Sequence, residues 1–208
     1  MRLKIAMIPH LPKLAVSDLP KGWHDPSDPP LSAEAHLQVP GFTLHLERQL
    51  LGGPLFIATA SLLRCRQTAR FAIERFGNVW GGGCPVITLE SLGQPDNGEP
   101  DPENPVADEK GLVYYGQRTS TEDWVRMCAH SISILGGIAE KMLNRPPFEV
   151  PEGSCVWVFT TRPLAAAARF IANGEEGPVN AMEPTLLPYT LYELDTEIGN
   201  VKELERVA

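Results

Sequence analysis

The chain has 208 residues, 43% of them hydrophobic, which fits one sizeable domain with a substantial core. Its 18 basic and 26 acidic residues give a formal net charge of -8 at pH 7. That charge argues against broad binding to the phosphate backbone of nucleic acids and against docking on anionic membranes. An anionic ligand therefore needs a locally basic pocket.

In chain order, the expected elements are a strand at 3–8, a helix at 31–51, a strand at 55–60, a helix at 61–76, a strand at 85–89, a helix at 119–144, a strand at 154–160, a helix at 163–172 and a strand at 185–194. The helix at 119–144 is expected to be the longest. In the helix at 31–51, Ser32 is a plausible N-cap, and Pro40-Gly41 predicts a split or a kink.

Three stretches of the chain read as connecting or peripheral segments. Residues 9–30 form a long loop rich in proline, aspartate, glycine and lysine. Residues 91–118 are so rich in proline and acidic residues that they resist packing, and they predict an exposed lid or insertion in a single domain spanning 1–208. The charged residues 197–208 are expected to be peripheral.

The cysteines and histidines give no sign of a metal centre. The cysteines are widely spaced within apolar segments, which indicates neither a zinc ribbon nor a disulfide framework, and the histidines lack metal-ligand spacing. The apolar run before Pro9 is too short for a signal peptide or a membrane span. We therefore expect a cytoplasmic protein without metal or cofactor.

The alternation of strands and helices predicts an α/β fold, a three-layer sandwich with a mainly parallel central sheet. Ligands of such sheets gather at the carboxyl ends of the strands. Polar groups occupy three of those ends: His10 after the first strand, Arg64 just past the second, and Thr160-Thr161-Arg162 after the fourth. An arginine in the first turn of a helix adds a bidentate donor to a helix end that already favours anions.

The segment around Arg64 resembles a known family. The run L-L-R-C-R-Q-T-A at residues 62–69 is similar to the strand-helix signature S-x-L-x-R-A-x-Q-T-A of the histidine phosphatase superfamily, the phosphoglycerate-mutase-like proteins. The matching positions are Leu62, Arg64, Gln67, Thr68 and Ala69. The resemblance extends over residues 3–195 and implies a phosphoglycerate-mutase-like fold.

Two further segments look like motifs of this family. Residues 8–11, I-P-H-L, stand where the family has an R-H-G triplet whose histidine is phosphorylated, so His10 keeps the nucleophile's position while Pro9 replaces the arginine. Residues 28–35, D-P-P-L-S-A-E-A, are similar to the family's D-x-P-L-T-x-x-G, with Ala35 in place of glycine.

By resemblance, two histidines and two arginines surround one phosphoryl group, and only His10 and Arg64 of the four are recognisable here. Thr161 stands where the second histidine belongs. Because phosphoryl transfer relies on positioning and charge stabilisation, two missing charge-assisted hydrogen bonds cost on the order of 3 to 6 kcal/mol of transition-state binding. Lys13 and Arg162, with the Thr161 hydroxyl, are the candidate substitutes for the phosphate ligands.

Two functions remain open. In the first, a phosphomonoesterase works through a phosphohistidine at His10, Arg64 holds the phosphate oxygens, and Glu90 after the third strand is the candidate proton donor. In the second, the protein is a catalytically inactive pseudophosphatase that binds a ligand or a protein. The expected partner is a small phosphorylated molecule or another anion rather than nucleic acid or membrane, and a homodimer is left open.

Overall fold

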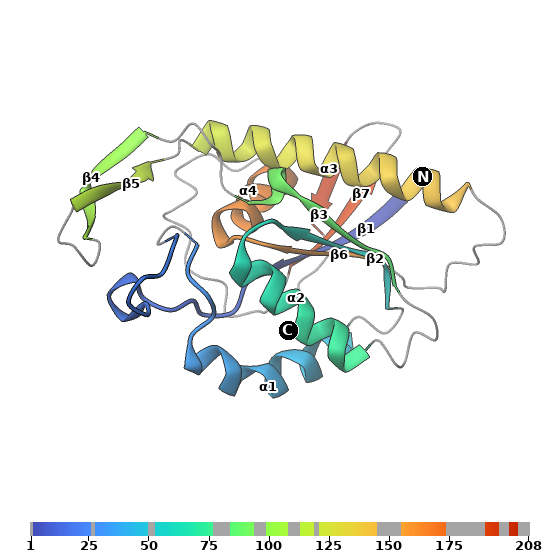
Figure 1. Cartoon of the computed structure of the whole chain (residues 1–208). Helices are drawn as coiled ribbons and strands as arrows, with labels where there is room; N and C mark the ends of the chain where they lie inside the picture. Colours follow the sequence, from blue (N-terminus) through green and yellow to red (C-terminus); the bar gives the residue numbers. More distant parts are fainter. Residues whose placement is uncertain are drawn as a thin grey trace.

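A central sheet of six strands organises the protein (Figure 1). The computed structural model describes residues 2–25, 28–49, 53–76, 84–93, 99–107, 113–118, 121–144, 155–173, 190–195 and 200–203. The strands of the sheet are β1 (Arg2–Pro9), β2 (Pro54–Ala60), β3 (Val86–Leu89), β6 (Cys155–Thr160), β7 (Thr190–Asp195) and β8 (Asn200–Glu203). Their order is β3-β2-β6-β1-β7-β8. The first four in this order run parallel, whereas β7 and β8 are antiparallel to their neighbours.

Helices cover both faces of the sheet. The helices α1 (Ala33–Gln49) and α2 (Leu63–Phe76) pack on one face, and α3 (Thr121–Leu143) and α4 (Arg162–Asn173) on the other (Figure 1). With 23 residues, α3 is the longest described helix, as the sequence predicts. The predicted α/β three-layer sandwich with a mainly parallel sheet is therefore confirmed.

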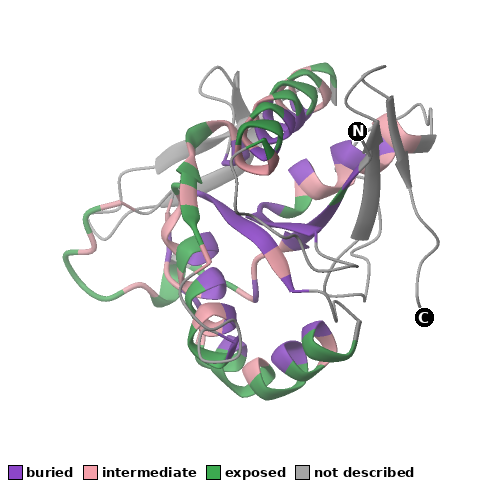
Figure 2. Ribbon diagram, turned by 90° about the vertical axis from the view of Figure 1, so that its right-hand side faces the viewer, coloured by how far each residue is buried: buried purple, intermediate pink, exposed green. Residues whose placement is uncertain are grey.

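The alternation of side chains along the strands divides the core into two halves. On β6, Val156 and Val158 pack with residues of α3 and α4, while Trp157 and Phe159 pack with residues of α1 and α2. The ring of Trp157 meets that of Phe76 edge-on, with centroids 5.5 Å apart. Figure 2 shows buried residues along the central strands and on the helix faces turned towards them. Because β6 is buried on both faces, its run of apolar residues is continuous.

The predicted break at Pro40 does not divide the helix. The helix α1 runs from Ala33 to Gln49 with Pro40 inside it. Proline removes one backbone donor, and Pro40 and Gly41 lie on the exposed side of α1, where water can satisfy the carbonyl that loses its partner. The Ser32 cap is confirmed, since its hydroxyl oxygen accepts the N–H of Ala35 at 3.2 Å.

The acidic, proline-rich segment contains more regular structure than its composition predicts. It includes a short 3-10 helix, η2 (Glu90–Leu92), and an antiparallel pair of strands, β4 (Glu99–Ala107) and β5 (Val113–Arg118). The register shifts between Asp101 and Pro105, and such an irregularity accommodates prolines in a strand that has one paired neighbour. A role as a lid stays a prediction.

The ends of the chain differ from expectation in one respect. Within the charged C-terminal segment, residues 200–203 form β8, an edge strand paired with β7 that the sequence did not predict. The last predicted strand begins at Thr190, and residues 185–189 lie outside the described residues. None of the helices in the described ranges is long and apolar enough to cross a membrane.

Candidate active site

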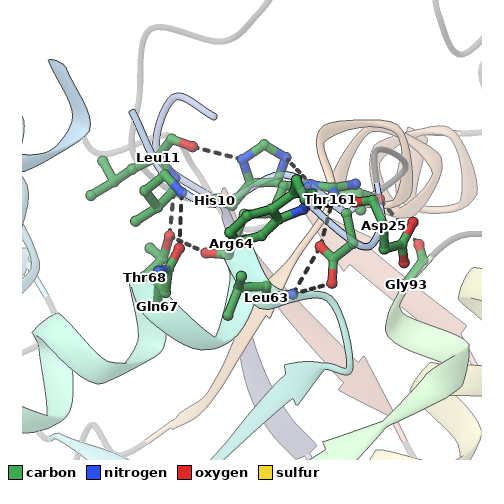
Figure 3. A network of polar contacts seen from close by, with 12 residues as sticks. His10, Leu11, Asp25, Leu63, Arg64, Gln67, Thr68, Gly93 and Thr161 are labelled. Atoms are coloured by element: carbon green, nitrogen blue, oxygen red, sulfur yellow. Dashed lines mark hydrogen bonds and ion pairs between the residues drawn. The ribbon is translucent and has the colours of Figure 1, made fainter. Parts of the chain in front are cut away.

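The carboxyl ends of β1, β2 and β6 bring the predicted site residues to one edge of the sheet. His10 follows β1, Arg64 lies in the first turn of α2 after β2, and Thr161 follows β6. Neighbouring strand ends are joined directly, since the backbone N–H of His10 donates to the carbonyl of Thr160 at 3.0 Å. His10 and Arg64, 54 positions apart in the sequence, are thus in contact (Figure 3).

The hydrogen bonds of His10 fix the state of its imidazole. Its Nδ1 lies 2.7 Å from the backbone carbonyl of Leu11, and its Nε2 lies 3.2 Å from Nε of Arg64. A carbonyl only accepts and a guanidinium only donates, so Nδ1 carries the proton and Nε2 keeps its lone pair. His10 is therefore a neutral imidazole whose Nε2 faces a positive charge.

The electrostatic surroundings of His10 favour that neutral form. Burial is the main cause that lowers the pKa of His10 from 6.5 to about 4. The hydrogen bond to the Leu11 carbonyl opposes this effect, whereas the positive charges of Arg64, Arg162 and Lys13 add to it. The charges of three cations thus act on one imidazole, although the whole chain is acidic.

Arg64 is held by a carboxylate that the sequence reasoning did not connect to it. The Asp28 carboxylate accepts the backbone N–H of Leu63, with its two oxygens at 2.9 and 2.7 Å, and lies 3.2 Å from Nη1 of Arg64. The Arg64 side chain is 6% exposed and that of Asp28 18%. Asp28 stood out in the sequence only as part of a linker motif, and its distance of 36 positions from Arg64 hides the ion pair.

The other matched residues of α2 anchor the two loops beside the site. The Thr68 hydroxyl donates to the carbonyl of Arg64 at 2.8 Å and accepts the N–H of Leu11 at 3.2 Å. The Gln67 side-chain oxygen accepts the N–H of Leu31 at 2.8 Å. These contacts explain why glutamine and threonine at these spacings accompany Arg64, because they fix the segments that carry His10 and Asp28.

Thr160, the last residue of β6, and Thr161, which follows it, direct their hydroxyls to the chain that follows β3. Thr160 donates to the carbonyl of Leu92 at 2.6 Å, and Thr161 donates to that of Gly93 at 3.3 Å. Gly93 packs closely here, since a Cβ at this position would lie 3.1 Å from the carbonyl oxygen of Glu90. The single hydroxyl proton of Thr161 is therefore engaged within the protein.

The remaining predicted site residues are Lys13, Arg162 and Glu90. Lys13 and Arg162 both act electrostatically on His10, although each residue keeps part of its surface exposed. Partial burial, with the charge of Arg64, lowers the pKa of Lys13. Glu90 begins η2 at the carboxyl end of β3 and is exposed.

The first turns of the helices at this edge lack acidic residues. The helices α2 and α4 have no acidic residue in the first turn and each carries an arginine there, Arg64 and Arg162. By contrast, α1 begins with Glu34, and α3 with Glu122 and Asp123. A cation at a helix N-terminus opposes the helix dipole, so this arrangement favours an anion between α2 and α4.

Thiol and metal chemistry find no support among the described residues. Burial raises the pKa of Cys65, the neighbour of Arg64, to about 12, so its thiol is a poor nucleophile at neutral pH. Within the described ranges, no group of three or more histidine, cysteine or acidic side chains is placed to hold a metal ion.

Comparisons with known proteins show similarity in structure alone. The sequence matches no protein-family model and no curated protein. A structure titled mycobacterial hydrolase 1 is similar with a TM-score of 0.62 at 15% identity, covering 100% of this chain and 98% of that one. A mycobacterial glucosyl-3-phosphoglycerate phosphatase with VO3 has a TM-score of 0.59 at 15% identity, covering 99% and 98%.

The protein histidine phosphatase SixA, complexed with tungstate, has a TM-score of 0.54 at 14% identity, covering 98% of this chain and 95% of that one. These similar structures are histidine phosphatase superfamily members. Structural similarity at such low sequence identity establishes the fold alone, so the chemistry has to be argued from the site. The chain has the phosphoglycerate-mutase-like fold of the histidine phosphatase superfamily.

Proposed function

We propose that this protein is a divergent phosphomonoesterase that transfers the phosphoryl group of a small phosphate ester to Nε2 of His10. The observation that carries the proposal is the contact between a neutral imidazole, with Nδ1–H held by the Leu11 carbonyl, and the guanidinium of Arg64. In-line attack on a phosphate ester requires a nitrogen lone pair and a positive charge beside it, and the lone pair of Nε2 becomes free for attack when the bound phosphate takes over the N–H of Arg64. The vanadate and tungstate complexes of proteins with this fold agree with an oxyanion at the site.

The phosphate oxygens would be held by the cations around His10. Arg64 contacts the imidazole directly, while Arg162 and Lys13 act on it from α4 and from the loop after β1. These two cations take over the charge that the family supplies through an arginine and a histidine, here replaced by Pro9 and Thr161. Most of the rate acceleration in phosphoryl transfer comes from such charge stabilisation.

The chemistry would proceed in two steps. Nε2 attacks phosphorus and forms an N–P bond while the P–O bond to the leaving group breaks, and Glu90 donates a proton to that oxygen. Water then attacks the phosphohistidine and gives a proton to the Glu90 carboxylate, the N–P bond breaks with its electron pair returning to Nε2, and inorganic phosphate is released. The exposed Glu90 at the next strand end is the acid we assign to the first step.

The nucleophile is tested with p-nitrophenyl phosphate as substrate. The wild-type protein should release p-nitrophenol and, after rapid denaturation, retain an acid-labile phosphoryl group, and H10A should abolish both. The control H130A changes an exposed histidine on α3 and should keep both. Turnover by H10A at the wild-type rate refutes the assignment.

The acid is tested separately through the leaving group. E90Q should slow the hydrolysis of an alkyl phosphate by roughly 100-fold or more, because an alkoxide needs a proton as it leaves. Hydrolysis of p-nitrophenyl phosphate should change little, since p-nitrophenolate leaves without one. Equal rates of wild type and E90Q with both substrates exclude Glu90.

One observation favours a second candidate, a pseudophosphatase that binds an anion without turnover. Thr161 occupies the position of the family's second histidine, and its hydroxyl proton is engaged by the Gly93 carbonyl. Under this alternative, isothermal titration calorimetry would detect tungstate binding that R64A weakens, while no phosphate ester is hydrolysed. Turnover gained by the double variant P9R/T161H would then identify the two substitutions as the cause of inactivity.

A further inference from the structure

We propose that Asp28 is a positioning residue that orients the Arg64 guanidinium so that its Nε–H faces Nε2 of His10. The inference rests on the proposed function in that it takes Arg64 as a phosphate ligand. It adds a residue that has no role in the two-step chemistry and that reaches the site from the loop after β1.

The contacts of Asp28 join the loop, the start of α2 and Arg64. Its carboxylate takes the N–H of Leu63 between its two oxygens, and one of these oxygens also contacts Nη1 of Arg64 at 3.2 Å. Nη1 and Nε lie on different sides of a planar fork, so fixing Nη1 also fixes the direction of Nε. The second fixed point of this fork is His10 Nε2, 3.2 Å from Nε.

The burial of this ion pair makes its geometry consequential. The Arg64 side chain is 6% exposed and has little solvent to replace a lost partner. The charge of Asp28 also reaches Lys13, where it opposes the lowering of the lysine pKa. One carboxylate therefore influences two of the three cations that act on His10.

The pKa of His10 distinguishes a positioning role of Asp28 from a purely electrostatic effect of its negative charge. Removing a nearby negative charge, with Arg64 left in place, would lower the pKa of His10 further. If the Arg64 side chain instead moves away from His10, the imidazole loses a neighbouring cation and the hydrogen bond that favours its neutral form, so the pKa of His10 rises. The two effects have opposite signs.

The experiment follows the imidazole of His10 by NMR in the full-length protein without ligand, with H10Q used to assign the signal. In D28N, the side-chain amide oxygen can still accept the N–H of Leu63, but the amide can no longer form an ion pair with a guanidinium. We expect D28N to raise the pKa of His10 by about one unit from its value of about 4. In an R64A background, D28N should produce no such rise.

The control is E47Q, which removes the carboxylate of an exposed pair, Glu47 and Arg75, also 3.2 Å apart. It should leave the pKa of His10 unchanged. If D28N does not fold, D28S supplies a second variant that keeps a helix-capping oxygen. A pKa of His10 that stays constant or falls in the folded Asp28 variants overturns the proposal.

This measurement is independent of turnover. If the protein is inactive but D28N raises the pKa of His10 as expected, the positioning role of Asp28 stands and only the phosphatase assignment fails. If the protein is active but D28N does not raise the pKa of His10, the phosphatase assignment stands and Asp28 has no positioning role.

Discussion

The lowered pKa of His10 predicts a specific loss of stability in mild acid. An unfolded chain protonates this histidine near pH 6.5, whereas the folded protein does so only near pH 4. The folded state therefore binds fewer protons between these values, and stability falls as the pH falls from 7 through 6.5 towards 4. For a histidine with these two pKa values, the loss between pH 7 and pH 5 is about 2 kcal/mol.

Urea denaturation at pH 7 and pH 5 measures this loss. Wild type should lose about 2 kcal/mol more unfolding free energy between the two pH values than H10Q, which has no imidazole to protonate at this position. The control H24Q alters an exposed histidine and should keep the wild-type pH dependence. The reasoning fails if wild type and H10Q lose the same free energy, because His10 would then titrate alike in both states.

Three further predictions concern other contacts. R64A should weaken tungstate affinity roughly 10- to 100-fold in calorimetry, the value of one charge-assisted hydrogen bond, and equal affinity would place the anion elsewhere. T160V should lower the unfolding free energy in urea by about 1 to 3 kcal/mol, since the Leu92 carbonyl loses a buried donor; no change would mean that the bond contributes nothing. W157A should cost about 3 to 5 kcal/mol in the same assay, and a loss below about 1 kcal/mol would contradict its central place in the core.

The parallel part of the fold was predictable because its signals are local. The apolar run of β6 and the proline in the first turn of α4 are features of neighbouring residues, and both elements appear within a residue or two of the predicted bounds. Strand β8 was missed because its pairing with β7 comes from tertiary structure, while its charged sequence reads as exposed. The antiparallel pair of β4 and β5 was missed for a similar reason, because the prolines of this segment argue against strands.

The candidate site was predictable only in part, for a related reason. The positions of His10 and Arg64 follow from strand ends, and a general rule about parallel sheets brings those ends together. The partner of Arg64 follows from no such rule, because Asp28 reaches it through the course of a long loop. The engagement of Thr161 with Gly93 likewise depends on two loops whose relative placement no periodicity encodes.

The order of strands has a consequence for how the protein is made. Strand β1 is synthesised before the other strands of its sheet, yet its neighbours are β6 and β7, which follow it by more than 140 residues. Until then its backbone donors and acceptors have no partners, a situation that slows folding and invites pairing with other chains. His10 can therefore acquire its complete surroundings only after β6, which carries Thr160, has been synthesised.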